Sequence, residues 1–176
     1  MVAVIDMPRR LRQRPKDHRG FPIPFTTLIV DGKPDFRISD PDRWLTCLCD
    51  LRCALCGQTL DEAWFVGGPS CEQSRQFLDP AMHRDCAEFA LRTCPFLSMP
   101  KGHFSDIERR PPPPGFAMVP GVDPKRPERF MLGRAPGYRR SGGGVGPVII
   151  ATAPWLELFW WKDGIRIVQP IPVRAV

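Results

Sequence analysis

The sequence predicts an α+β fold in which small antiparallel β-hairpins and few helices surround a cluster of cysteine and histidine residues. Three observations support this prediction. Two apolar runs are each interrupted by an Asp-Gly pair, which is a strong signal for a tight hairpin turn. Two short motifs each join two metal-binding residue types at positions i and i+3. The 176 residues also include 22 prolines, so long helices should be few.

The first part of the chain carries signals for a hairpin followed by a helix. Apolar residues on both sides of Asp31-Gly32 predict two strands between residues 23 and 38. Asp40 followed by Pro41 is typical of a helix start, so a short helix is expected over 41–51. Its inner face is expected to carry Trp44, Leu45 and Leu48.

A strand and a second helix are expected in the centre of the chain. The apolar run 63–66 predicts a strand that ends at two glycines and a proline. A helix is expected from near His83 to Arg92, because Pro95 cannot continue it. Helical spacing places five residues on its inner face, namely Cys86, Phe89, Ala90, Thr93 and Cys94.

The last third of the chain begins with a proline- and glycine-rich stretch and ends in aromatic residues. Four consecutive prolines at 111–114 predict an extended linker or loop. Short strands are expected over 129–134 and 148–152, and a hairpin over 156–168 around Asp163-Gly164. Strand alternation puts Trp160 on the face opposite Trp161, so this strand is either buried on both sides or exposes one aromatic face to a partner.

The two short motifs have the spacing of metal ligands. Cys53 and Cys56 can present both thiolates to one point from a single turn, and Gly57 lets the chain bend directly afterwards. His83 and Cys86 share one face of the first turn of a helix. A zinc ion prefers four such donors in a tetrahedron. We therefore expect one structural zinc ion held by Cys53, Cys56, His83 and Cys86.

A turn-borne pair, a hairpin and a helix-borne pair, with 26 residues between the pairs, resemble a treble-clef zinc finger. Some nucleases of this class place a catalytic histidine between the ligand pairs. No histidine lies between Gly57 and Met82, and four protein ligands leave a zinc ion no open position. We therefore expect no catalytic residues and no enzyme. The alternative is a small cysteine-based or nuclease-like enzyme that uses residues outside the zinc site, such as Cys71 with Arg75 or the segment 35–37.

The remaining cysteines allow other interpretations. Cys94 is too far along the helix from Cys86 to share its ion, so packing is expected. Cys47, Cys49 and Cys71 either pack or build a second metal site. The spacing Cys49-x3-Cys53-x2-Cys56 also matches the iron–sulfur motif of enzymes that make radicals from S-adenosylmethionine. This chain is short for that fold and lacks its glycine-rich signature.

Several segments between residues 18 and 100 are similar to a group of small bacterial and phage proteins. The similar segments are Gly20-Phe-Pro-Ile-Pro-Phe25, Asp31-Gly-Lys-Pro-Asp-Phe-Arg37, Arg52-Cys-Ala-Leu-Cys-Gly57, Phe65-Val-Gly-Gly-Pro69, Met82-His83 with Cys86-Ala87, and Cys94-Pro-Phe-Leu97. The resemblance implies a treble-clef-like site of three cysteines and one histidine, and the group has no established function that could be transferred to this chain.

Charge is unevenly distributed along the chain, whose net charge is +6. Residues 21–100 have 7 basic and 11 acidic side chains, whereas residues 1–20 have 6 and 2 and residues 101–140 have 9 and 4. The basic flanks could contact nucleic acid or protein, or could only keep the chain soluble. We expect a zinc-stabilised, non-enzymatic binding or adaptor protein, with self-association through the tryptophan-rich hairpin as one form of partnership.

These observations suggest four segments along the chain. They are a basic flexible arm (1–20), a zinc-binding α+β core (21–105), a Pro/Gly-rich basic linker or loop (106–147) and a C-terminal β-hairpin packed on the core (148–176). Neither a secretory signal nor an apolar run long enough to cross a bilayer is visible, so a cytoplasmic location away from membranes is expected.

Overall fold

A computed structural model describes residues 6–99, 126–141 and 148–167, and within them the α+β class is confirmed. The helices of this part are α1 (Arg9–Arg12), α2 (Pro41–Cys49), α3 (Pro69–Ser74), α4 (Arg84–Thr93) and α5 (Pro95–Ser98). The strands are β1 (Thr27–Val30), β2 (Lys33–Ser39), β3 (Ala63–Gly67), β4 (Gln76–Phe77), β5 (Phe130–Ala135), β6 (Tyr138–Ser141), β7 (Val148–Ala151), β8 (Glu157–Lys162) and β9 (Ile165–Ile167). None of these helices has the length and apolar character needed to cross a membrane.

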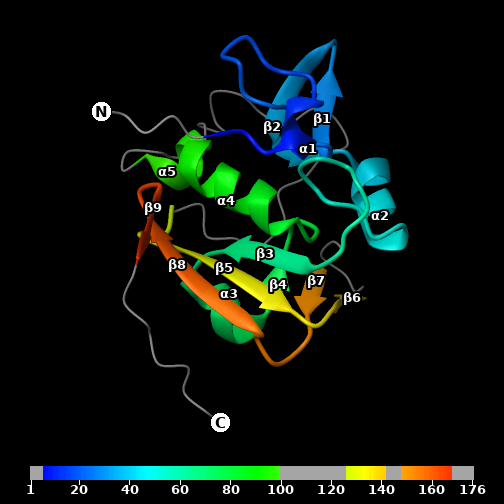
Figure 1. Cartoon of the computed structure of the whole chain (residues 1–176). Helices are drawn as coiled ribbons and strands as arrows, with labels where there is room; N and C mark the ends of the chain where they lie inside the picture. The colour runs from blue at the N-terminus through cyan, green and yellow to red at the C-terminus, as the bar shows by residue number, and fades with distance from the viewer. Residues whose placement is uncertain (1–5, 100–125, 142–147, 168–176) are drawn as a thin grey trace.

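An antiparallel sheet with strand order β3-β5-β8-β9 forms the centre of the fold. Helices α4 and α5 lie over one face and α3 lies against the other (Figure 1). Side chains alternate between two cores, as the pleat requires. The first core, beside α4, includes Trp64, Leu132 and Trp161. The second core, on the opposite face, includes Met131 and Trp160.

This alternation decides between the two interpretations of the aromatic strand. Trp160 is 3% exposed and Trp161 is 2% exposed, and they belong to different cores. Both tryptophans of β8 are therefore buried, one in each core.

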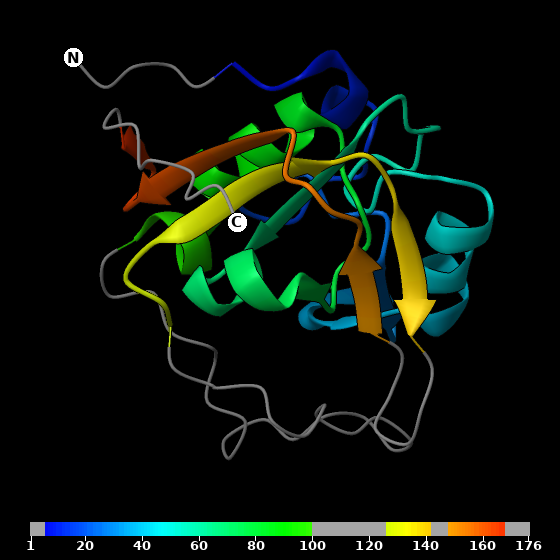
Figure 2. The ribbon, with the colours of Figure 1, turned by 90° about the horizontal axis from the view of Figure 1, so that it is seen from below.

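A second sheet has the strand order β4-β7-β6, and β6 and β7 lie side by side in Figure 2. Its strands contribute Phe77 and Ile149 to the second core. After its earlier strand β4, the chain comes back to this sheet directly after β5, through Pro136-Gly137, and returns from β7 to β8. The helix α2 adds Trp44 to this core, and the indole Nε1 of Trp44 donates to the carbonyl of Leu78 at 2.7 Å.

Both hairpins that the Asp-Gly pairs predict are present. In each turn the aspartate and the glycine have positive φ, at 50° and 73° for Asp31 and Gly32 and at 48° and 77° for Asp163 and Gly164. Two successive left-handed residues match the twist of the flanking strands. The predicted helix start is also confirmed, since the carboxylate of Asp40 accepts from the amides of Asp42 and Arg43.

The N-terminal residues 6–20 differ from the flexible arm that we expected. Leu11, on α1, is only 2% exposed and belongs to the first core. Arg10 donates to the carboxylate of Asp85 at 3.2 Å and 3.3 Å. One apolar residue in a basic run gives no local sign of such packing, so the correction comes from the tertiary structure. Residues 1–5 lie outside the described part.

The predicted linker over 106–147 contains two strands, β5 and β6. The strand β5 lies in the middle of the central sheet, between β3 and β8, so it is part of the core. This position agrees with the separate expectation of a strand over 129–134. The predicted unit 148–176 is also divided, because β7 belongs to the second sheet and β8–β9 to the first. Residues 106–125, 142–147 and 168–176 are outside the described residues.

The predicted inner faces of the two longer helices need correction. On α2, Leu45 is 38% exposed, whereas Cys47 is fully buried. On α4, Cys86 and Phe89 are buried as expected, but so are Ala87 and Leu91. Ala90, Thr93 and Cys94 are only half-buried. The helix α4 carries a wider apolar surface because both the central sheet and the segment around Leu11 belong to its core.

Candidate metal centre

Cys53 and Cys56 lie in a tight turn between α2 and β3. The amide of Cys53 donates to the carbonyl of Gln58, and the amide of Gly57 donates to the carbonyl of Cys53, both at 2.8 Å. Gly57 has a φ of 77°, in the left-handed region that favours glycine. These bonds hold the two cysteine side chains on one side of the turn, as metal ligands require.

A second constraint at Gly57 comes from the neighbouring chain. A Cβ atom at this position would lie 2.7 Å from the ring of Phe25. The same segment binds the turn through its backbone, since the amide of Phe25 donates to the carbonyl of Leu55 and that of Thr26 to the carbonyl of Ala54. The residues just before β1 therefore hold the cysteine turn against the rest of the site.

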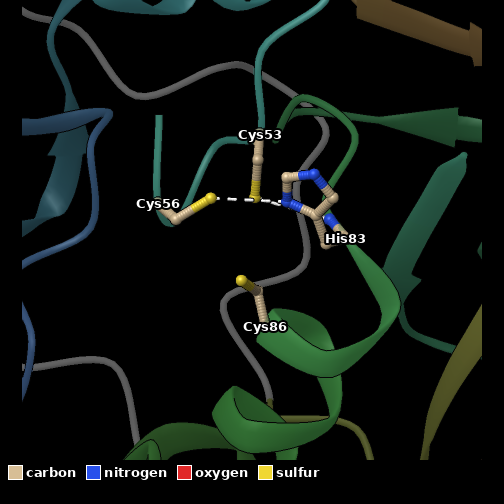
Figure 3. A group of neighbouring side chains, drawn as sticks. All are labelled: Cys53, Cys56, His83 and Cys86. Atoms are coloured by element: carbon tan, nitrogen blue, oxygen red, sulfur yellow. Dashed lines mark hydrogen bonds between the residues drawn. The ribbon is translucent and has the colours of Figure 1, made fainter. Parts of the chain in front are cut away.

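His83 and Cys86 lie at the start of α4. An antiparallel bridge joins Trp64 to Met82 through two backbone hydrogen bonds of 3.2 Å and 2.8 Å, and His83 follows as the N-cap residue of α4. The side chain of His83 makes no capping bond, and it points toward the cysteines (Figure 3). The hairpin expected between the ligand pairs is thus reduced to one bridge, with α3 and β4 between its two sides.

The four predicted ligands come together as one buried group. Their ligand atoms lie within 4.8 Å of one another (Figure 3). Two thiolates on a tetrahedral zinc ion are about 3.8 Å apart, because each Zn–S bond is about 2.3 Å long. The exposed fractions are 0% for Cys53, 6% for Cys56, 2% for His83 and 0% for Cys86. The group could hold a metal ion.

The ring of His83 is oriented by a second hydrogen bond. Its Nε2 lies 2.9 Å from the carbonyl oxygen of Thr59, and its Nδ1 lies 3.3 Å from Sγ of Cys56. A carbonyl only accepts, so Nε2 is the donor in this contact and Nδ1 is the atom directed at the sulfurs. Metal-binding histidines commonly donate their other ring nitrogen in this way. The backbone amide of His83 also donates to Sγ of Cys53 at 3.4 Å.

The protonation of the group is strongly coupled. Hydrogen bonds from Cys56 and Cys86 hold the pKa of Cys53 far below its usual value, whereas the pKa of Cys86 is raised by its hydrogen bonds to Cys53 and Cys56. Burial lowers the pKa of His83, but the hydrogen bonds and charges of Cys53 and Cys56 outweigh this effect and raise the pKa to about 10. A metal ion would therefore displace protons from this group when it binds.

The other cysteines do not join the site. Within residues 6–99, 126–141 and 148–167, no second group of three or more metal-binding side chains has this geometry. Cys49 is exposed and lies outside the group, so the iron–sulfur spacing is not realised. Cys47 is fully buried, and burial together with nearby Cys53 raises its pKa to about 12. Cys71 and Cys94 are half-buried.

The two residue pairs of the enzyme alternative have internal contacts. Asp35 and Arg37 form a partly buried ion pair at 2.6 Å within β2. Burial raises the pKa of Cys71, which is the direction opposite to activation of a thiol. Arg75 donates to the carbonyl of Thr152 at 2.7 Å and lies 4.3 Å from the centroid of the Trp155 ring.

Sequence reasoning named all four residues of the group and missed the residues that position them. Thr59, Phe25 and the Trp64–Met82 bridge act through backbone groups or close packing, which leave no pattern in residue type. Comparisons of the chain with protein-family models, with curated proteins and with solved structures gave no match in any of the three. The site is therefore described by its own geometry, as a buried group of three cysteines and one histidine that could hold a metal ion.

Proposed function

We propose that the group binds one structural zinc ion and that the chain is a non-enzymatic binding module stabilised by that ion. The observation that carries the proposal is the convergence of four buried ligand atoms within 4.8 Å. Three soft sulfur donors and one imidazole suit zinc better than magnesium or calcium, which prefer oxygen.

A structural role follows from the number of ligands. Four protein ligands complete the tetrahedral shell of zinc, whereas a catalytic ion keeps a position for water or substrate. The site also joins separate parts of the first core, because one ligand pair belongs to the turn after α2 and the other to the start of α4. An ion at this point would stabilise the fold by linking them.

The charges of the N-terminal flank favour a protein partner over nucleic acid. Three of its arginines are already paired within the chain, as Arg10 with Asp85, Arg12 with Asp6 and Arg19 with Asp17. Basic residues that bind acidic neighbours attract phosphate less strongly, since the neighbours compete for the same charge. Specific nucleic-acid binding through this flank is therefore the weaker candidate.

Cobalt substitution tests the proposed coordination. Cobalt(II) occupies tetrahedral zinc sites and absorbs visible light strongly when thiolates bind it, so full-length protein reconstituted with Co²⁺ should turn blue-green at one equivalent. Added zinc should displace the cobalt and remove the colour. Cys86→Ser should lower the intensity of the thiolate-to-cobalt charge-transfer band by the share of one of the three sulfurs. Cys94→Ser, as the matched control, should leave the spectrum unchanged. A colourless or pink octahedral complex in the unaltered protein would reject the site.

A further inference from the structure

A groove of about 200 Å³ lies between α2 and β6. Leu45, Leu48 and Cys49 form its helical wall, and Tyr138, Arg139 and Arg140 form its strand wall. The hydroxyl of Tyr138 lies 3.5 Å from the carbonyl of Cys47, which brings the two walls together at the floor. None of these side chains belongs to the candidate metal group, which consists of Cys53, Cys56, His83 and Cys86.

The strand wall of the groove is the edge of a sheet. In the order β4-β7-β6, only one side of β6 is paired, and no described backbone group bonds to its other side. An open edge presents a row of amide and carbonyl groups at the spacing that an added strand requires. A groove bounded by an edge strand and a helix is a common site of β-strand addition.

The helical wall of the groove is apolar and uncovered. Leu45 is 38% exposed, although its position on α2 follows the pattern of an inner-face residue. Leu48 beside it is half-buried against the second core. An apolar side chain from an added strand would cover Leu45 and remove its exposed surface from water.

The charge of the groove identifies the occupant. Arg139 and Arg140 are exposed, and neither makes an ion pair with any residue in the described part of the chain. No acidic side chain lines the groove. We propose that this groove binds an extended acidic peptide segment of a partner protein, which adds to β6 as a strand, pairs carboxylates with Arg139 and Arg140, and covers Leu45.

This inference rests on the proposed binding role, and it specifies the surface and the chemistry of the partner. The backbone bonds to β6 supply the general attraction, whereas the two arginines and the apolar wall select the sequence. An extended segment suits the site better than a helix, because a helix satisfies its own backbone groups and leaves the edge of β6 unpaired.

A selection from phage-displayed linear peptides of about ten residues tests the proposal on zinc-loaded full-length protein. Enriched peptides should combine acidic residues with at least one apolar residue. The double variant Arg139→Glu/Arg140→Glu and the single variant Leu45→Asp should each weaken the best peptide by at least about tenfold. Two variants of matched chemistry on exposed residues elsewhere, Lys33→Glu and Ile165→Asp, should leave its affinity unchanged.

Hydrogen exchange separates strand addition from simple charge attraction. The selected peptide should slow exchange of backbone amides over residues 138–141, with no comparable change in β9. Selection of basic or neutral peptides, full binding by Leu45→Asp, or unchanged exchange at 138–141 would overturn the proposal. Binding of a single-stranded oligonucleotide that depends on Arg139 and Arg140 but not on Leu45 would instead assign the surface to nucleic acid. Because each variant's zinc content is measured separately, failure in the groove with zinc retained leaves the zinc module intact.

Discussion

The turn at Gly57 gives a sharp test of how the metal group is built. Gly57→Ala introduces two separate costs. The left-handed φ of 77° is unfavourable for alanine by about 1 kcal/mol. The new Cβ would also lie 2.7 Å from the ring of Phe25, and such overpacking typically costs about 1–3 kcal/mol. We therefore expect a total loss of about 2–4 kcal/mol in the free energy of unfolding.

Gly32→Ala is the control for the conformational cost alone. Gly32 has a similar φ of 73°, but no atom lies within 4 Å of the added Cβ. It should lose only the conformational part, about 1 kcal/mol. Urea denaturation at a fixed excess of zinc measures both variants, and competition with a chelator measures their zinc affinity. Gly57→Ala should also bind zinc more weakly because the cysteine turn must move, whereas Gly32→Ala should not.

The reasoning would be refuted by equal stability losses in the two variants. That result would mean that the contact between Phe25 and the turn does not constrain the metal group. A destabilised Gly57→Ala with unchanged zinc affinity would separate the packing of the turn from its role in holding the ligands.

The remaining predictions concern packing and thiol reactivity. Leu11→Ala should lower the free energy of unfolding by about 2–5 kcal/mol in urea denaturation, because it leaves a cavity at a buried position. Arg10→Ala, which removes only a partly exposed ion pair with Asp85, should cost less. Equal losses in the two variants would contradict the burial of Leu11. Arg126 donates to two carbonyls of α5 and to Asp163, so Arg126→Ala should lower the free energy of unfolding by about 2–4 kcal/mol, and Arg126→Lys should recover only part of that loss. An unchanged stability in urea denaturation would contradict the importance of these bonds. Iodoacetamide labelling, mapped by mass spectrometry, should modify Cys49 first, because it is the one exposed cysteine of the seven. Cys47 should react slowly, because burial raises its pKa to about 12. Fast alkylation of Cys47 would contradict the described packing.

Features with a local signature were predictable from the sequence. The Asp-Gly turns specify two left-handed residues in succession, and both hairpins follow from that requirement. The ligand pairs were predictable for the same reason, because a turn and a helix start each bring side chains at i and i+3 to one side. The start of α2 followed from the capping chemistry of Asp40.

Features that depend on distant partners were not predictable in the same way. The strand β5 joins β3, which lies more than sixty residues earlier, and nothing in its residues states which strand will pair with it. Leu11 looks like an isolated apolar residue in a basic segment until the first core is assembled around it. Leu45 shows the opposite case, since helical spacing places it inside and the sheet containing β6 leaves it uncovered.

Metal content tests the central claim most directly. Inductively coupled plasma mass spectrometry on full-length protein purified without added metal should find about one zinc per chain. Cys53→Ser and His83→Ala should both lose zinc and much of their stability, while Cys94→Ser should keep both. Iron in place of zinc, no metal in the unaltered protein, or full zinc content in both ligand variants would contradict the account.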